Sequence, residues 1–394
     1  MENFVYEYPT KVLFGKGAAK EHLGKALSAY GPNVMLAYGG GSIHQNGVYG
    51  EMMELLGAAG KTVTEFRGIM PNPTYAKVQE GAALAREKHI DFILAVGGGS
   101  VIDCCKVIAA QAVLEEDIWD MELVQHWLPT VPPIPMGAVV TASGTGAEMN
   151  GGAVITHEEK KVKTGIFAAA PRFAVLDPDY TLSVPFAQVM SGAFDTLSHA
   201  METYFGRADR DNVSDDLAEA VMRSTIRNMR TLLREPNDYT ARSNLMWDSA
   251  LAENGILKCG RATDFQAHQI EHQLGAYTDC NHGQGLAVIH PPLYRVMCEK
   301  APEKFARFAV NVWGISSQRK TERELAAAGV DALALFIREC GLPARLGELY
   351  MKVDAPKLLT SGMLKEIADS SNLIGAGCAC VSHEEIFQIL KDCL

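Results

Sequence analysis

Four residues in the second half of the chain have the types and spacing of a metal site. Asp195 and His199 stand four positions apart in a stretch, residues 193–200, that we expect to be helical, and His268 and His282 follow later. A helix places residues i and i+4 on one face, about 6 Å apart, so both side chains can reach one ion. Three imidazoles and one carboxylate give a divalent cation mixed nitrogen and oxygen ligands and leave positions open for substrate. An open metal site predicts chemistry rather than a scaffolding role.

The neighbouring residues extend this prediction and leave one ambiguity. His272 stands one helical turn after His268, and spacing alone does not decide whether it is a ligand, a core histidine or a nearby proton relay. Gly283 and Gly285, which follow His282, predict a tight turn that aims its imidazole. With neutral imidazoles, one carboxylate and a dication leave a net positive charge, which favours an anionic substrate oxygen over a neutral one.

A metalloprotease is the competing interpretation of the same segment. His268, Glu271 and His272 fit the inverted zincin pattern, in which two histidines bind zinc and the glutamate acts as the base. That interpretation gives no role to Asp195, to His199 or to the glycine-rich turns described below. It is therefore the less favoured hypothesis.

The elements that must carry these residues change character midway along the chain. The first half alternates short apolar runs with helical stretches, which predicts a parallel β-sheet covered by helices on both faces. The second half shows helical periodicity without convincing strands. Prolines near residues 171–185 mark the change. We predict an α/β dinucleotide-binding domain over residues 1–182 and an all-α metal-binding catalytic domain over residues 183–394. The expected strands are residues 34–38, 62–66, 92–96, 134–140 and 173–176.

Two glycine-rich turns follow expected strands in the first half. Glycine permits positive φ and a close approach of the backbone to a ligand, and a helix N-terminus offers unpaired N–H groups. The second turn therefore predicts a pyrophosphate site, with Ser100 capping the helix and Asp103 completing a capping box. Neither turn is the GxGxxG fingerprint, and a tight turn without a ligand is the alternative. The residues are Gly39, Gly40, Gly41 and Ser42 in the first turn and Gly97, Gly98, Gly99 and Ser100 in the second.

A third loop, residues 141–148, alternates hydroxyl-bearing residues with glycines. It suits contact with a ribose, a diphosphate or a nicotinamide, and a simple polar turn is the alternative. Beside the first turn, His44 and Gln45 bring no acid before Glu51 that could grip the ribose diol of NAD. We therefore expect NADP(H) as the cofactor, with NAD(H) as the alternative.

Composition excludes several classes of partner. The chain has 394 residues and a formal net charge of -11, which argues against nucleic acid or an anionic membrane. The first residues include an acid and no long apolar run, so we expect no secretory signal. The nine cysteines are expected to be free thiols in a reducing cytoplasm.

Together these motifs resemble the iron-containing, or group III, alcohol dehydrogenases, and among them the butanol dehydrogenase and broad-range aldehyde reductase branch. The resemblance covers nearly the whole chain. The motifs that carry it are, in order, residues 8–17, 71–73, 97–103, 144–148, 176–178, 195–199 and 268–283.

The resemblance implies a two-domain enzyme, a homodimer at the level of the family, with iron or sometimes zinc. It implies that Asp195, His199, His268 and His282 are the ligands and that His272 lies near the metal. One departure concerns the first turn, where the branch often has basic residues and this chain has His44 and Gln45. The cofactor contacts implied by the resemblance are Gly97, Gly98, Gly99, Ser100, Asp103, Thr141, Thr145, Asn72 and Lys163.

We therefore expect an enzyme that interconverts a primary alcohol such as butanol and its aldehyde by hydride transfer. Glycerol dehydrogenase or dehydroquinate synthase chemistry on the same fold is the first alternative. A sugar-phosphate substrate would need clustered basic residues near the metal, and the sequence has none between Arg261 and Arg295. A non-enzymatic nucleotide or metal sensor is the second alternative.

Overall fold

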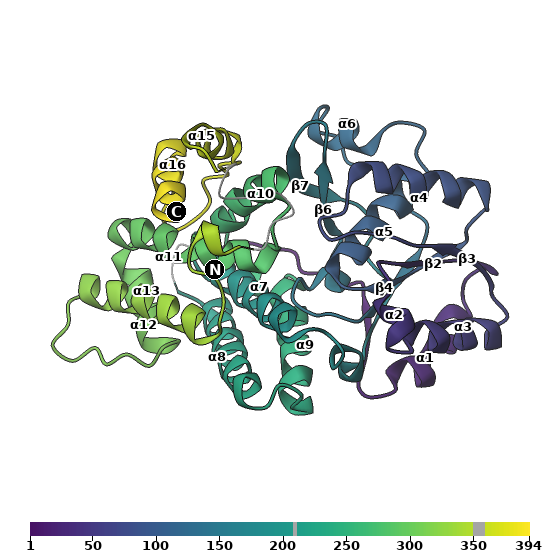
Figure 1. Ribbon diagram of the computed structural model, residues 1–394, viewed down its shortest axis with the longest axis horizontal. Helices are drawn as coiled ribbons and strands as arrows, with labels where there is room; N and C mark the ends of the chain where they lie inside the picture. The colour runs from purple at the N-terminus through teal and green to yellow at the C-terminus, as the bar shows by residue number, and fades with distance from the viewer. Residues whose placement is uncertain (208–210, 350–358) are drawn as a thin grey trace. The chain divides into compact units, whose positions relative to one another are not determined.

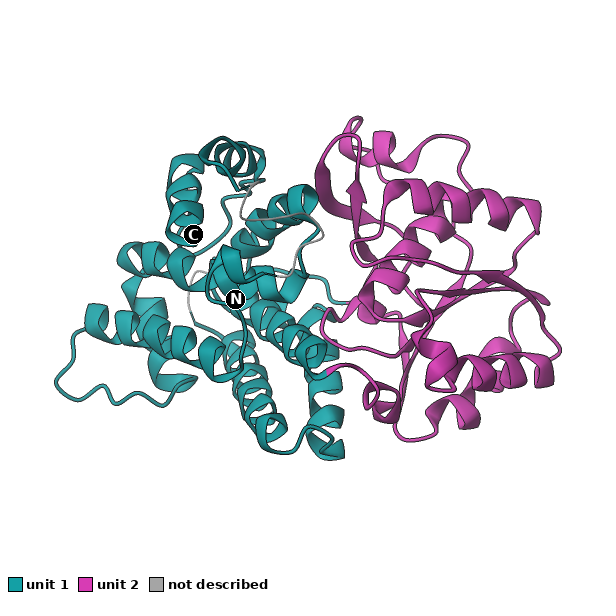
Figure 2. Cartoon of the chain, in the orientation of Figure 1, with its two compact units in different colours: residues 1–6, 186–394 teal, residues 7–185 magenta. Residues whose placement is uncertain are grey.

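The structure of the chain is a computed structural model that describes residues 1–207, 211–349 and 359–394. It divides into two compact units (Figure 2): an α/β unit, Glu7–Pro185, and a helical unit formed by Met1–Tyr6 and Phe186–Leu394. The domain boundary expected between residues 182 and 183 stays a prediction. In the described residues, no helix has the length and apolarity that a membrane span requires.

The α/β unit is built on a parallel sheet with the strand order β1-β8-β5-β4-β2-β3 (Figure 1). The strands are β1 (Lys11–Phe14), β2 (Asn33–Tyr38), β3 (Thr62–Phe66), β4 (Phe92–Gly97), β5 (Met136–Val140) and β8 (Phe173–Leu176). The central strands β4 and β5 are buried throughout, as continuous apolar runs predict for strands covered on both faces. Strand β1 is not among the expected strands, because this edge strand has only four residues, most of them at least partly exposed.

Helices cover both faces of this sheet (Figure 1). On one face, Leu23 and Leu27 of α1 and Met52 of α3 join a core with Leu36 and Leu94 of the strands. On the other face, α4 and α5 pack against each other. The helices are α1 (Ala18–Leu27), α2 (Ser42–Gln45), α3 (Val48–Ala58), α4 (Tyr75–Glu87), α5 (Gly99–Gln111) and α6 (Ile118–Leu123), with 3-10 turns at Ala147–Met149 and Pro178–Thr181.

An antiparallel pair, β6 (Gly152–His157) and β7 (Val162–Phe167), forms a separate two-stranded sheet. The sequence analysis does not anticipate it, because both strands mix buried with partly exposed residues and β7 contains the polar residues Lys163 and Thr164. The fold class, a parallel-sheet unit followed by a helical one, is confirmed.

The helical unit contains only helices as regular elements among its described residues, besides isolated bridges. Helix α7 is buried over most of its length and packs against α8, α9 and α11, so it forms the centre of this unit. The helices are α7 (Phe186–Tyr204), α8 (Val213–Arg234), α9 (Tyr239–Glu253), α10 (Gln266–Thr278), α11 (His282–Lys300), α12 (Pro302–Asn311), α13 (Glu322–Glu339), α15 (Ser361–Ser370) and α16 (His383–Asp392), with 3-10 turns at Ile256–Lys258 and Leu346–Glu348.

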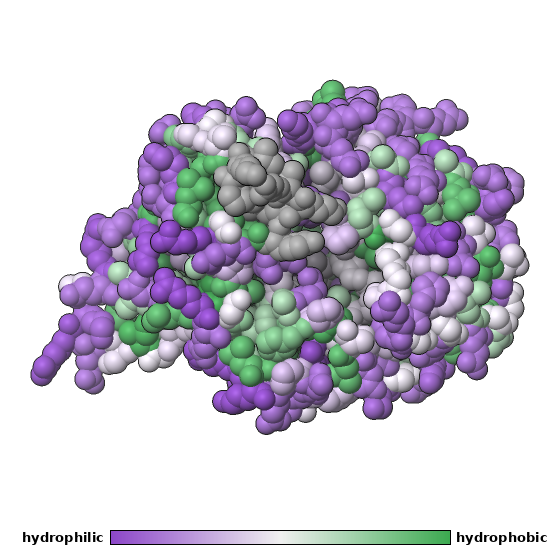
Figure 3. Space-filling model, in the orientation of Figure 1, coloured by the Kyte–Doolittle hydropathy of each residue, from purple (hydrophilic) through white to green (hydrophobic). Residues whose placement is uncertain are grey.

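The surface differs in character from these cores. On the face drawn in Figure 3, hydrophilic residues predominate and the hydrophobic ones form scattered groups. Such a distribution is ordinary for a chain whose large apolar side chains fill internal cores.

Candidate metal centre and cofactor turns

Helix α7 places Asp195 and His199 one turn apart on its buried face. Asp195 is 3% exposed and His199 is 8% exposed. Nδ1 of His199 lies 3.7 Å from Oδ1 of Asp195. The helix thus brings together the two side chains that the i, i+4 spacing pairs.

Helices α10 and α11 bring two further imidazoles to the same carboxylate. Nε2 of His268 and Nε2 of His282 each lie 3.5 Å from Oδ1 of Asp195. One potential ligand atom from each of these three residues lies within 4.8 Å of the other two. His199 is outside that three-residue group, and its ring stacks on His268 with the centroids 4.5 Å apart. All four predicted ligands therefore lie in one cluster, with three of them closest together.

Unsatisfied buried atoms in this cluster test whether its residues fit a metal ion. Oδ1 of Asp195, Nδ1 of His199 and Nε2 of His268 are buried and have no hydrogen-bond partner in the part of the chain that the structure describes. Leaving a buried polar atom unpaired costs about 1–3 kcal/mol, and native proteins rarely tolerate several at one place. Imidazole nitrogens with one carboxylate oxygen suit Fe²⁺ or Zn²⁺. The residues present therefore fit a divalent transition metal.

Two buried glutamates contact the far nitrogens of these imidazoles. Oε2 of Glu202 is hydrogen-bonded to Nδ1 of His268, and Oε2 of Glu271 is hydrogen-bonded to Nδ1 of His282. Together with Asp195, the two glutamates bring three negative charges, which outweigh the two positive charges of a divalent ion. The expectation of a net positive site is therefore wrong, because it counts only one carboxylate.

The sequence analysis missed Glu202, although a signal for it exists. Glu202 follows Asp195 by seven residues and His199 by three, so it continues the same buried face of α7. Extending the i, i+4 pair by one more turn would have included it among the site residues.

The charges of the cluster act on one another. Burial raises the pKa of Asp195, but the nearby His199 and His282 lower it by more than burial raises it. The pKa therefore lies below its usual value, and the carboxyl stays ionised. Burial lowers the pKa of His268, but the carboxylates of Glu202 and Asp195 raise it more strongly. A bound cation would compete with that proton, because a metal ligand must be a neutral imidazole.

His272 lies beside this cluster. It stands on α10 one turn after His268, is 7% exposed, and stacks its ring on His282 at a centroid distance of 5.7 Å. It groups with Glu271 and His282 and not with Asp195. Its roles as proton relay and as ligand both stay predictions.

The tight turn expected after His282 does not form. His282 is the first residue of α11, and Gly283 and Gly285 lie within the first turn of that helix. A Cβ at Gly283 would lie 2.2 Å from the carbonyl oxygen of Ser191, and one at Gly285 would lie 2.9 Å from Cγ of Glu271. These glycines therefore allow α11 to pack closely against α7 and α10.

The same geometry weakens the protease interpretation. Glu271 is fully buried, and its carboxylate pairs with His282 on the side of the imidazole away from Asp195. A general base must reach the proton it removes, so this glutamate is not placed as the base that a zincin requires.

The second glycine-rich turn joins β4 to α5. Gly98 is the N-cap residue of α5, a helix of thirteen residues whose first N–H groups suit an anion. Gly97, Gly98 and Gly99 do not adopt the positive φ that glycine permits. A Cβ at Gly99 would lie 2.3 Å from Oγ1 of Thr145, and one at Gly97 would lie 2.5 Å from Cγ2 of Val101. Glycine is needed here for close packing.

The capping box expected at this turn is also wrong. Gly98 occupies the N-cap position, which leaves Ser100 inside the first helical turn. The carboxylate of Asp103 accepts a hydrogen bond from the backbone N–H of Val154 at 2.9 Å and pairs with Nζ of Lys106 at 3.4 Å. Asp103 therefore joins α5 to β6, and the capping motif does not form because the helix begins two residues earlier than the motif requires.

The third loop packs against the second turn. The backbone N–H of Thr141 donates to the carbonyl oxygen of Gly97 at 3.0 Å, and Thr145 occupies the space above Gly99. Burial raises the pKa of Glu148, which follows in this loop, to about 7.

Two further predicted cofactor contacts lie in the same unit. Lys163 is on β7 with 4% of its surface exposed, and Asn72 has a φ of 51° before α4. Cofactor contact at either position stays a prediction.

The first glycine-rich turn is different. It leads into α2, a helix of only four residues, and a Cβ at Gly40 or Gly41 would meet nothing within 4 Å. The nearby carboxylate of Glu65 accepts hydrogen bonds from the hydroxyls of Tyr38 at 2.5 Å and Tyr49 at 3.0 Å. This carboxylate is therefore already hydrogen-bonded to two phenols.

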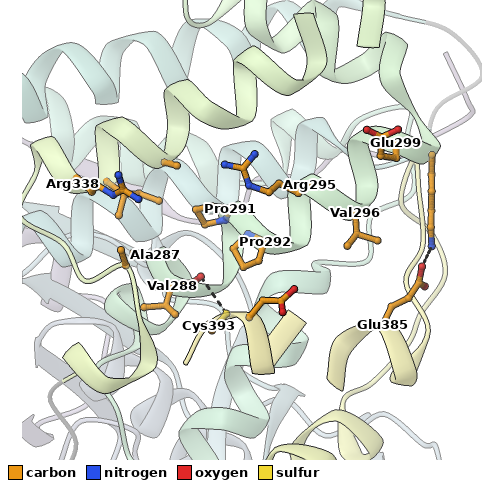
Figure 4. Close-up of a pocket in the computed structure, with 15 residues that line it drawn as sticks. Ala287, Val288, Pro291, Pro292, Arg295, Val296, Glu299, Arg338, Glu385 and Cys393 are labelled. Atoms are coloured by element: carbon orange, nitrogen blue, oxygen red, sulfur yellow. Dashed lines mark hydrogen bonds and ion pairs between the residues drawn. The ribbon is translucent and has the colours of Figure 1, made fainter. Parts of the chain in front are cut away.

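A separate pocket of about 620 Å³ lies in the helical unit between α11, α13 and α16 (Figure 4). Val288, Pro291 and Pro292 supply apolar wall, and the ion pair of Lys300 with Glu385, 2.6 Å long, closes one side. None of the predicted site residues lines it. It is therefore distinct from the histidine cluster.

Known proteins resemble the chain over its whole length. The profile described as iron-containing alcohol dehydrogenase matches residues 9–178, and the profile described as the C-terminal part of the Fe-containing alcohol dehydrogenase family matches residues 189–394. A probable NADH-dependent butanol dehydrogenase of Bacillus subtilis is 39% identical over 99% of each chain. An NADPH-dependent aldehyde reductase of Escherichia coli is 36% identical over 88% of this chain and 89% of its own.

A solved structure shows the same likeness in three dimensions. The crystal structure of an NADH-dependent butanol dehydrogenase A from Thermotoga maritima superposes with a TM-score of 0.90 at 33% identity, covering 100% of this chain and 99% of the other. The likeness therefore extends across both units of the chain.

Proposed function

Because the chain belongs to the iron-containing alcohol dehydrogenase family, on its butanol dehydrogenase and aldehyde reductase branch, we propose that it interconverts primary alcohols and aldehydes by hydride transfer. The family confirms the resemblance that the motifs predicted. The observation that carries the proposal is the convergence of Asp195, His268 and His282, with buried atoms that lack hydrogen-bond partners among the described residues.

The metal ligands in this proposal are Asp195, His199, His268 and His282. Iron, with zinc as the alternative, supplies a Lewis acid that lowers the pKa of an alcohol and polarises a carbonyl. The four side chains would hold that ion in one place, with Asp195, His199 and His268 buried and His282 partly exposed. The substrate proposed is a butanol-sized alcohol or the matching aldehyde.

A nicotinamide cofactor accompanies this chemistry in the family, and the proposed cofactor is NADP(H), with NAD(H) as the alternative. The N-terminus of α5 at the second turn suits its pyrophosphate. At the first turn, Glu65 already accepts hydrogen bonds from Tyr38 and Tyr49, and Ser42 and His44 can hydrogen-bond the ribose or its 2′-phosphate.

His272 is proposed to move the proton between substrate and solvent. It lies one helical turn from His268, and its ring stacks on His282. An imidazole can both donate and accept a proton through its two ring nitrogens, which suits a general acid–base role.

The proposal is tested with protein loaded with Fe²⁺ or Zn²⁺, by following oxidation of NADPH and of NADH with butanal. The parent protein should reduce butanal, and His268→Ala and His282→Ala should each lose bound metal and activity together. His272→Ala should lower turnover while metal stays bound.

Three results would count against parts of the proposal. Full turnover with stoichiometric metal in either ligand variant would refute the ligand set. Loss of metal in the His272 variant would make that residue a ligand. A lack of nicotinamide oxidation with any alcohol or aldehyde of a panel would favour a sensor over an enzyme.

A further inference from the structure

We propose that Glu202 and Glu271 are positioning residues of the metal centre, which hold His268 and His282 so that each Nε2 faces Asp195. The inference rests on the proposed metal centre and names two residues that set its affinity. Each glutamate comes from a different helix from the imidazole that it contacts.

Glu202 fixes the backbone and the ring of His268 together. Its Oε1 accepts a hydrogen bond from the backbone N–H of Ala267 at 2.6 Å, and its Oε2 accepts one from the backbone N–H of His268 at 3.2 Å. The N-cap residue of α10, Phe265, has a φ of 49° and makes no side-chain cap. Glu202 of α7 therefore caps the N-terminus of α10 in place of a local side chain. Its Oε2 also contacts Nδ1 of His268.

Glu271 contacts the ring of His282. It is completely buried, its Oε2 contacts Nδ1 of His282, and its Oε1 accepts a hydrogen bond from Sγ of Cys280 at 3.7 Å. A Cβ at Gly285 would lie 2.9 Å from Cγ of Glu271. The absence of a side chain at Gly285 therefore makes room for this carboxylate.

Both contacts select one tautomer of the imidazole. An ionised carboxylate can only accept a hydrogen bond, so Nδ1 must carry the proton and Nε2 must present its lone pair. The nearby negative charge also makes the ligand nitrogen more basic. Loss of such a contact typically weakens metal affinity by about 10–100-fold.

The two glutamates differ in how cleanly they can be tested. Replacing Glu202 also removes two backbone hydrogen bonds at the start of α10 and should lower the stability of the protein. Those two N–H groups donate to Glu202 and keep their partner when Glu271 is replaced, so Glu271→Gln is the primary variant. Gly285→Ala perturbs the same carboxylate without changing it chemically.

The experiment measures zinc affinity of the metal-free full-length protein by competition with a chromophoric chelator. Glu271→Gln should weaken zinc binding by about 10-fold and Glu271→Ala by up to about 100-fold, with Gly285→Ala also weakening it. The melting temperature of the metal-free Gln variant should match that of the parent. The absorption spectrum of bound Co²⁺ should shift in the Glu271 and Gly285 variants, since it reports ligand geometry.

Matched controls separate positioning from general damage. Asp248→Asn replaces another buried carboxyl of the helical unit, and Gly362→Ala adds a Cβ whose nearest contact, Oγ1 of Thr360, is 3.8 Å away. Neither should change zinc affinity.

Each outcome bears on one proposal. If the parent binds no zinc at this site, the proposed metal centre fails. If the parent binds zinc and Glu271→Gln binds it equally well, the positioning role is overturned. Equal weakening by Asp248→Asn or by Gly362→Ala would likewise overturn it in favour of an indirect effect on folding.

Discussion

The two glycine-rich turns have the same four letters, Gly-Gly-Gly-Ser, and different structures. Gly97 and Gly99 in the second turn face side chains so closely that a Cβ would overlap Val101 or Thr145. Gly40 and Gly41 in the first turn face open space. The second turn opens a helix of thirteen residues, whereas the first leads into one of four.

This difference shows that one tetrapeptide serves two physical purposes. In the second turn glycine permits dense packing of β4, α5 and the third loop. Helix α5 is also long enough for its N-terminus to attract an anion. In the first turn glycine leaves the backbone open to whatever approaches it. The comparison predicts that substitutions at the second turn act on folding and those at the first act on ligand binding.

The largest expected effect is that of Gly99→Ala. The new Cβ would lie 2.3 Å from Oγ1 and 2.5 Å from Cγ2 of Thr145, so the loop or the helix start must move. The free energy of unfolding should fall by about 3 kcal/mol, at the upper end of overpacking effects. Urea denaturation followed by circular dichroism measures this change.

A rescue experiment checks the packing explanation. Gly97→Ala meets Cγ2, Cβ and Cγ1 of Val101 instead of Thr145. Val101→Gly, which removes all three atoms, should therefore restore stability to the Gly97 variant and not to the Gly99 variant. Recovery of both variants, or of neither, would show that close contacts with these two side chains are not the reason for the glycines.

A smaller effect is expected at Glu148, which is buried in the loop that packs on the second turn. Burial raises the pKa of Glu148 to about 7, so the folded protein keeps a proton that the unfolded chain releases at lower pH. The protonated form contributes stability below its ordinary pKa, and this contribution is lost as the pH rises through about 7. Glu148→Gln should therefore gain about 2 kcal/mol relative to the parent between about pH 5 and pH 8.

Chemical denaturation at a series of pH values measures this difference. A stability gap between Glu148→Gln and the parent that stays constant with pH would mean that the carboxyl titrates normally. Glu148 would then not be the buried, protonated neighbour of the second turn that we predict.

The smallest effect on stability is expected for Gly40→Ala in the first turn. With nothing within 4 Å of the new Cβ, the free energy of unfolding should change by less than about 0.5 kcal/mol. The KM for the nicotinamide cofactor should rise if the backbone contacts it here. A loss of stability comparable to that of Gly99→Ala would remove the distinction between the two turns.

Much of the fold could be predicted from local pattern. Buried strands such as β4 read as continuous apolar runs, and long helices such as α7 show their period, because burial on two faces or on one stripe constrains residue type directly. The edge strand β1 and the β6–β7 pair escaped notice because partial exposure relaxes that constraint.

The candidate site divides in the same way. Spacing on one helix sufficed to pair Asp195 with His199, because helical geometry repeats regardless of the rest of the fold. The contact of Glu271 with the far nitrogen of His282 depends on how α10 and α11 cross, and sequence distance carries no record of that crossing. The predicted capping box also depended on contacts between segments. The carboxylate of Asp103 pairs with Lys106 and accepts a hydrogen bond from the backbone of β6.

By itself the sequence determined the class of chemistry, since residue types define which ions and cofactors a chain can bind. Only the tertiary structure decided which carboxylates stand behind the imidazoles and which glycines are packed tightly. Those properties arise from distances between segments far apart in the chain, and such distances are set when the helices and strands pack together.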